Sequence, residues 1–121
     1  MSSSSPRPVV HTFFMLVRTT PRWLALPPGE RFAFVGAKVA PLLAAHPAVS
    51  MRYYDAEAFS ARVTDVIVWQ TAELREYQTI VEKLRETEFW GTYFDVVELV
   101  PAVENAYATH YQVAPLGAGG A

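Results

Sequence analysis

The order of its apolar segments is the feature that most constrains the fold of this chain. Four short runs rich in β-branched and aromatic residues predict strands, and two longer segments with apolar residues at helical spacing predict helices. The predicted strands cover residues 9–18, 49–55, 62–70 and 93–100, and the predicted helices cover residues 30–46 and 72–86. Pro41 inside the first helical segment predicts a kink or an early end. This order of elements is typical of the split βαβ arrangement.

The predicted fold class is therefore α+β, a ferredoxin-like βαββαβ domain with a four-stranded antiparallel sheet. One layer of helices covers one face of such a sheet and leaves the other face open. Because an open apolar face favours association, we expect two copies to stack into a dimeric α+β barrel. The expected boundaries are a disordered tail at residues 1–8, one domain at 9–113 and a flexible tail at 114–121.

Composition and charge exclude several classes of function. Ten basic and twelve acidic residues give a formal net charge of -2, without the basic stripe of a nucleic-acid-binding protein. No apolar run approaches the roughly 20 residues of a membrane span, and the serine-rich start lacks the apolar core of a signal peptide. The absence of cysteine excludes disulfides and thiolate chemistry. We expect a cytoplasmic homodimer that binds a small molecule and neither nucleic acid nor membrane.

Charged residues on the two central strands suggest how these strands pair. If Arg52 lies opposite Asp65, then Asp55 lies opposite Arg62, and both cross-strand pairs are complementary. This register predicts a helix-covered face with Val49, Met51, Tyr53, Thr64, Val66 and Val68. It predicts an open face with Ser50, Arg52, Tyr54, Val63, Asp65, Ile67 and Trp69. The open face would then combine apolar walls with a few polar groups, as small-molecule cavities do.

The first and last strands add two further candidates to this site. His11 shares a strand face with Phe13, and we place both toward the open face because an imidazole under a helix would need a dedicated partner. Glu98 carries the charge in the middle of the last strand. The candidate catalytic residues are His11 and Asp65, and the candidate substrate-binding residues are Phe13, Arg52, Tyr54, Trp69 and Glu98.

These residue types fit acid–base chemistry, and they also fit purely structural roles. Burial would raise the pKa of Asp65, whereas an adjacent Arg52 would lower it and favour a permanently ionised structural carboxylate. His11 has a side chain that titrates near neutral pH, yet a lone histidine on a strand is more often structural. Trp69 and Tyr54 suit stacking on an aromatic ligand and equally suit packing in a core or an interface.

The sequence shows no motif for a cofactor or a metal. It contains no glycine-rich phosphate loop, no GxSxG elbow and no HExxH motif, so we expect no bound cofactor. His11, Glu104 and His110 match no known metal-ligand spacing, so we expect no metal site. Haem ligation through His11 or His110 stays open as an alternative.

Three stretches carry a resemblance to a known family. Residues 18–34, 52–69 and 84–113 resemble the darcynin-like family, and the resemblance covers about residues 13–113. It supplies neither an activity nor catalytic residues. In topology alone the chain is similar to dimeric α+β barrel proteins, which include cofactor-free monooxygenases, polyketide cyclases, haem-dependent chlorite dismutases and stress-response proteins. A fold so widely shared does not decide function.

The sequence favours a small cofactor-free enzyme that acts on an aromatic or polyketide-like metabolite in natural-product biosynthesis. Cyclisation, isomerisation or dehydration needs only shape, a base and a polarising donor, and a monooxygenase-type reaction in the same cavity is a close variant. The alternative is a non-catalytic small-molecule-binding or dimeric accessory protein, which fits the absence of a strong catalytic motif. The two hypotheses differ in whether a bound aromatic metabolite is converted to a product.

Overall fold

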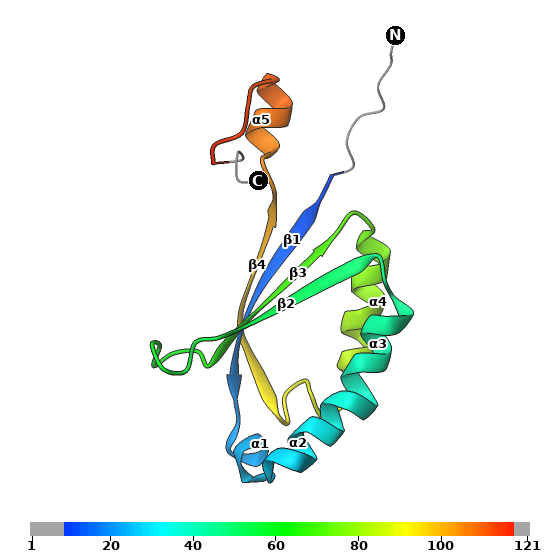
Figure 1. The fold of residues 1–121 in the computed structure, drawn as a ribbon, viewed down its shortest axis with the longest axis vertical. Helices are drawn as coiled ribbons and strands as arrows, with labels where there is room; N and C mark the ends of the chain where they lie inside the picture. Colours follow the sequence, from blue (N-terminus) through cyan, green and yellow to red (C-terminus); the bar gives the residue numbers. More distant parts are fainter. Residues whose placement is uncertain (1–8, 118–121) are drawn as a thin grey trace.

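The computed structural model describes residues 9–117 and confirms the predicted four-stranded antiparallel sheet (Figure 1). The sheet is made of β1 (His11–Thr19), β2 (Val49–Asp55), β3 (Asp65–Thr71) and β4 (Phe94–Val103). The strand order β2-β3-β1-β4, with every neighbouring pair antiparallel, is that of a ferredoxin-like domain. The expected tail at residues 1–8 and the end of the expected C-terminal tail, residues 118–121, lie outside the described residues.

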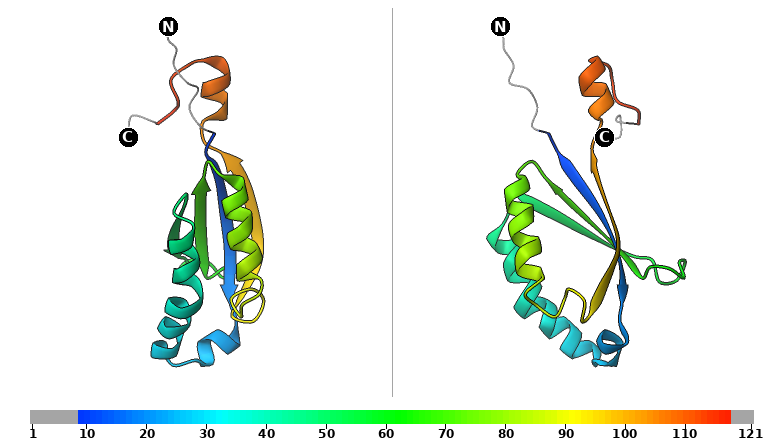
Figure 2. Two further views of the ribbon diagram at one scale, coloured as in Figure 1. Left: turned by 90° about the vertical axis from the view of Figure 1, so that its right-hand side faces the viewer. Right: turned by 180° about the vertical axis from the view of Figure 1, so that it is seen from behind.

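The helices lie on one side of this sheet and leave its other face uncovered (Figure 2). They are α1 (Pro21–Ala25), α2 (Pro28–Phe34), the π-helical turn η1 (Val35–Val39), α3 (Ala40–Ala45) and α4 (Leu74–Leu84). A further helix, α5 (Ala106–Tyr111), follows β4 beyond the end of the sheet and was not predicted from the sequence. Within residues 9–117, no helix has the length and apolar character needed to cross a membrane.

Two prolines are accommodated inside their elements. Pro41 lacks a backbone donor, and the turn before it is π-helical, with the Ala40 N–H donating to the Val35 carbonyl. The helix therefore continues to Ala45 instead of ending early. Pro101 lies within β4, which is an edge strand and tolerates a residue without a ladder donor. For this reason β4 extends beyond the predicted end at residue 100 to Val103.

The register of β2 and β3 differs from the predicted one. Arg52 pairs with Val68, three residues beyond the predicted partner Asp65, and Asp65 pairs with Asp55. Because side chains alternate along a strand, an odd displacement exchanges the two faces of β3. The burial of large apolar side chains under the helices, about 1.5–3 kcal/mol each, outweighs a cross-strand charge pair worth at most about 1 kcal/mol.

The core lies between the sheet and the helices. Its most completely buried large side chains are Trp69, Met15, Ile67, Ile80, Leu84 and Val17. Phe13 of β1 stacks on Tyr77 of α4, with ring centroids 3.9 Å apart and planes inclined by 3°. The odd-numbered residues of β1 and β3 thus face the helices, and this packing positions the site described below.

Ile67→Ala should lower the free energy of unfolding by about 2–5 kcal/mol, because the truncation leaves a cavity in the core. The Ile67 side chain is 2% exposed. Leu24→Ala on α1 is the control, since this side chain is 58% exposed and its loss should change stability by at most about 0.5 kcal/mol. Urea unfolding followed by circular dichroism measures both. A loss below about 1 kcal/mol for Ile67→Ala would support the register predicted from the charges.

Candidate functional site

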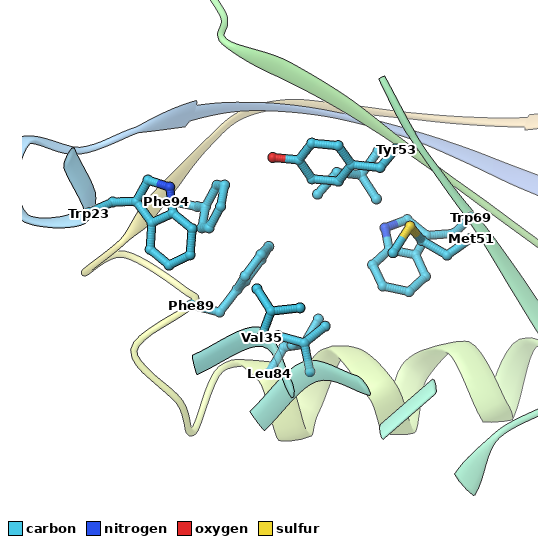
Figure 3. Close-up of a pocket in the computed structure, with 10 residues that line it drawn as sticks. Trp23, Val35, Met51, Tyr53, Trp69, Leu84, Phe89 and Phe94 are labelled. Carbon is cyan, nitrogen blue, oxygen red and sulfur yellow. The ribbon is translucent and has the colours of Figure 1, made fainter. Parts of the chain in front are cut away.

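An apolar cavity lies between the sheet and the helical layer (Figure 3). Its volume is about 120 Å³, close to that of the roughly 150 Å³ apolar cavity that accommodates benzene. We call this space the inner cavity, and it is lined by Trp23, Val35, Val39, Met51, Tyr53, Ile67, Trp69, Leu84, Phe89 and Phe94. Tyr53 and Val35 are 43% and 40% exposed, so the cavity reaches the surface between β2 and η1.

The short helix α1 positions Trp23 as one wall of the inner cavity. The Thr20 hydroxyl caps this helix by accepting a hydrogen bond from the Trp23 N–H at 3.3 Å. The Arg31 guanidinium donates to the carbonyl groups of Trp23, Leu24 and Leu26 at 3.0–3.1 Å. The Trp23 ring then packs against Phe94, with centroids 5.0 Å apart. Because α1 alone is too short to be stable, these contacts hold the wall in place.

Asp65 and Tyr53 form a polar pair at one end of the inner cavity. Asp65 is 3% exposed, and its carboxylate accepts a hydrogen bond from the Thr64 hydroxyl at 2.7 Å. The Tyr53 hydroxyl lies close enough to influence the pKa of this carboxyl. Burial raises the pKa of the Asp65 carboxyl, and the nearby hydroxyl groups of Thr64 and Tyr53 offset part of the rise. Burial and the Asp65 charge also raise the pKa of Tyr53, which keeps the phenol protonated. The pair therefore places a carboxyl group with a raised pKa beside a hydroxyl that lines the cavity.

Two exposed carboxylates add negative charge beside this pair. Oxygen atoms of Asp55, Glu57 and Asp65 lie within 4.8 Å of one another. The Glu57 charge contributes to the raised pKa of Asp65. Because Asp65 is already hydrogen-bonded to Thr64, we interpret the cluster as a cause of this pKa shift and do not assign a metal to it.

A wider hollow lies on the open face of the sheet. We call it the outer hollow, and its volume is about 590 Å³. It is lined by Thr12, Phe14, Arg52, Tyr54, Val66, Val68, Gln70 and Glu104. The Gln70 amide donates to the Thr12 hydroxyl at 3.2 Å, whereas Arg52 forms no ion pair with any residue between 9 and 117. The outer hollow thus has an apolar floor and a guanidinium without a charged partner.

The structure divides the predicted site residues between the two faces of the sheet. Phe13, Asp65 and Trp69 face the helices, whereas Arg52 and Tyr54 line the outer hollow. The predicted Arg52–Asp65 pair on the open face is therefore wrong, because the observed register places these two side chains on opposite faces.

His11 differs from its predicted position, whereas Glu98 lies on the open face as predicted. His11 lies at the start of β1 on the same side as Phe13, which is the helix side. It lines neither the inner cavity nor the outer hollow. Glu98 pairs across the strands with Leu16, contacts Arg62 at 3.3 Å, and does not line the outer hollow. The predicted Asp55–Arg62 pair is wrong, because Asp55 pairs with Asp65 across the strands and the Arg62 guanidinium contacts Glu98.

Neither histidine suggested as a haem ligand lines the inner cavity or the outer hollow. His110 lies on α5, where its ring packs edge-on against Tyr111 with centroids 4.7 Å apart. His11 and His110 are both absent from the lining of the inner cavity and of the outer hollow. The arrangement of the described residues therefore does not support the haem alternative.

Several cavity residues were not singled out from the sequence. Tyr53 was correctly predicted to face the helices, yet it was not recognised as a site residue. Trp23 lies on the short helix α1, Phe89 lies in a loop, and Phe94 is the first residue of β4. Hydrophobic periodicity gives no signal in such short or terminal segments. The signal that could have found them is the density of aromatic residues in segment 89–94.

A family model and several similar sequences match most of this chain. The family model described as "Darcynin, domain of unknown function" matches residues 2–119. A Darcynin homolog from Granulibacter bethesdensis is 48% identical over 101 residues, which are 83% of this chain and 82% of that relative. A Darcynin homolog from Streptomyces avermitilis is 47% identical over 106 residues, which are 87% of this chain and 88% of that relative. The resemblance indicated by the sequence is confirmed.

Comparisons with solved structures concern the fold alone. The chlorite dismutase of Candidatus Nitrospira defluvii in complex with imidazole matches with a TM-score of 0.66 and 19% identity, over 78% of this chain and 39% of that one. A putative chlorite dismutase matches with a TM-score of 0.69 and 13% identity, over 89% of this chain and 50% of that one. This chain thus spans between 39% and 50% of the length of these solved chains.

Asp65→Asn should flatten the dependence of stability on pH. Burial raises the pKa of Asp65 above its ordinary value of 3.8, so the folded protein retains this proton to higher pH than the unfolded chain. The contribution of Asp65 to the free energy of unfolding is therefore fully favourable below the unfolded pKa and decreases as pH rises through the folded pKa. Urea unfolding from about pH 4 to about pH 8 measures this decrease.

The control for this prediction is Asp95→Asn, because Asp95 is an exposed residue of β4. We expect its pH profile to match that of the unmodified protein. Identical slopes for the unmodified protein and Asp65→Asn would contradict the prediction.

Proposed function

We propose that this chain, which belongs to the Darcynin family, is a cofactor-free enzyme that binds a single-ring aromatic metabolite and transfers a proton at an oxygen of that ligand. The observation that carries the proposal is the inner cavity, which has apolar walls and ends at the Tyr53–Asp65 pair. Apolar walls with a few placed polar groups are typical of small-molecule sites, and perturbed pKa values cluster in such sites.

The size of the inner cavity favours one ring over a fused polyketide skeleton. Its volume of about 120 Å³ suits a ligand close to benzene in size. The ring would lie between Phe89, Trp69 and Val35, and a polar substituent would point toward the hydroxyl of Tyr53 (Figure 3).

Tyr53 is the catalytic residue in this proposal, and Asp65 acts through it. When Asp65 is protonated, its O–H donates to the Tyr53 oxygen, and the Tyr53 O–H is then free to donate to a carbonyl oxygen of the ligand. During enolisation the Tyr53 hydroxyl gives its proton to the carbonyl oxygen of the ligand, and Asp65 gives its proton to Tyr53. A water molecule at the cavity mouth takes a proton from the carbon next to the carbonyl group. Solvent reprotonates Asp65. Because the protonated carboxyl is the active form, the rate should fall as pH rises through its pKa.

Deuterium exchange into phenylacetone tests the proposal. In heavy water the protein should accelerate exchange of the protons next to the carbonyl group, as followed by NMR. Asp65→Asn and Tyr53→Phe should each lower the accelerated rate about 100-fold, which is the scale of general acid–base catalysis. Tyr54→Phe is the matched control, because this neighbour on β2 faces the outer hollow and should leave the rate unchanged.

The outcomes of this exchange experiment separate the two hypotheses drawn from the sequence. Binding of phenylacetone without accelerated exchange would replace the enzyme proposal by non-catalytic ligand binding. Equal rates for Tyr53→Phe and the unmodified protein would remove the role given to Tyr53. Val35→Phe should fill the mouth of the inner cavity and abolish binding, which links the measured exchange to this cavity.

We further propose that two copies of the chain associate through their open sheet faces. This face carries the apolar side chains of Phe14, Val66 and Val68, and a second copy would remove them from water. Arg52 lies at the β2 edge of the sheet without a charged partner. Glu104 lies just beyond the β4 edge, and Glu98 on β4 is already paired with Arg62. The open face therefore carries opposite charges at its two edges.

A two-fold axis parallel to the strands would make these edges complementary. It places β2 of one copy over β4 of the other, as in any isologous pairing of one surface with itself. Across the sheet, Arg52 pairs with Val68, Val68 pairs with Phe14, and Phe14 pairs with Val100. In the pair, Arg52 would therefore lie between the positions of Glu98 and Glu104 of the second copy.

Charge reversal tests this association. Arg52→Glu should weaken the dimer about 30-fold or more, because one partner of each interfacial charge pair is replaced by a like charge. Combining Arg52→Glu with Glu104→Arg should restore association. Arg75→Glu on α4 is the control, since Arg75 is exposed on the helical side. Sedimentation equilibrium measures all four proteins, and a monomeric unmodified protein would contradict the proposal.

A further inference from the structure

A buried hydrogen-bond donor without a partner borders the inner cavity. Three buried side-chain atoms of the described residues lack a hydrogen-bond partner, namely Nε2 of His46, Nε1 of Trp69 and the hydroxyl oxygen of Tyr77. His46 already uses its other ring nitrogen to contact Glu76 at 2.8 Å, and neither His46 nor Tyr77 lines the cavity. Trp69 does line it, and its side chain is 2% exposed.

The position of Trp69 explains why the protein itself leaves this donor unpaired. Trp69 pairs across the strands with Met51, and the remaining lining residues near it are apolar. Figure 3 shows the indole nitrogen on the edge of the ring that faces the space between Tyr53 and Phe89. Solvent does not reach this atom, so water does not replace the missing acceptor. A buried N–H without an acceptor is unfavourable, and native proteins rarely keep one without a reason.

We infer that the ligand of the inner cavity is an oxygenated aromatic ring whose hydroxyl, ether or carbonyl oxygen accepts a hydrogen bond from Nε1 of Trp69. Met51 lies beside the indole and is a flexible side chain, so it can turn aside to admit this oxygen (Figure 3). This inference rests on the proposed function, because it concerns a ligand in the same cavity. It adds a second polar contact, distinct from the one made by Tyr53.

Two polar contacts define a ligand class more narrowly than one. Tyr53 would contact the oxygen of a side chain near the cavity mouth, and Trp69 would contact an oxygen attached to the ring itself. The site would then discriminate against rings that lack this oxygen, because an unpaired Trp69 N–H would stay buried in their complexes. The predicted class is a hydroxylated or alkoxylated phenyl ring that carries a carbonyl side chain.

Binding of phenylacetone and of its 2-, 3- and 4-hydroxy derivatives tests this inference by calorimetry. At least one hydroxy isomer should bind the unmodified protein about tenfold more tightly than phenylacetone, as expected for one added hydrogen bond. Trp69→Phe should remove this preference, so that phenylacetone and its hydroxy isomers bind the variant with similar affinities, because the substitution removes the indole N–H. Trp90→Phe is the matched control, since Trp90 does not line the cavity and should not alter the preference.

A second measurement covers the case in which Trp69→Phe does not fold. In ¹⁵N-labelled unmodified protein, the indole N–H resonance of Trp69 should move downfield when the preferred hydroxy isomer binds, and it should move less with phenylacetone. Phenylacetone binding with no gain from any hydroxyl group would overturn the inference and leave the proposed function standing. Failure of phenylacetone and all three isomers to bind would instead overturn the proposed function.

Discussion

The burial of alternate residues along β3 is the constraint on which the rest of this structure depends. Asp65, Ile67, Trp69 and Thr71 are buried, whereas Val66, Val68 and Gln70 between them face the other way. β3 lies between β1 and β2 and is paired with both. The set of β3 residues that faces the helices, which we call the phase of β3, therefore also decides which residues of both neighbours face the helices. Each large apolar side chain placed under the helices contributes about 1.5–3 kcal/mol, and several do so together.

The same phase places a carboxyl group at the border of an apolar core. Asp65 is the first residue of β3, where the hydroxyl groups of Thr64 and Tyr53 can reach it. A buried carboxylate is costly even when it is hydrogen-bonded, and this cost is expressed as the raised pKa of Asp65. The burial that packs β3 against the helices therefore also raises the pKa of Asp65, on which the proposed proton transfer depends.

Strand alternation also separates the two proposed tasks of the sheet. On β2, Met51 and Tyr53 border the inner cavity, whereas Arg52 and Tyr54 border the outer hollow. Ligand binding and association can therefore be altered independently by changes at neighbouring positions. The likeness to chlorite dismutases extends only to the fold, and the argument for the site rests on the residues of this chain.

The sequence by itself determined the order of the strands and helices, because hydrophobic periodicity is a local property. It also placed Tyr53 and Met51 correctly toward the helices. It could not decide the phase of β3, so Asp65 and Trp69 were placed on the wrong face and the cavity was sought there. The charges of Arg52, Asp65, Asp55 and Arg62 suggested a plausible register, but such pairs are worth at most about 1 kcal/mol each. The observed register depends on burial summed over β1, β3 and α4, and that sum exists only once these elements are packed together.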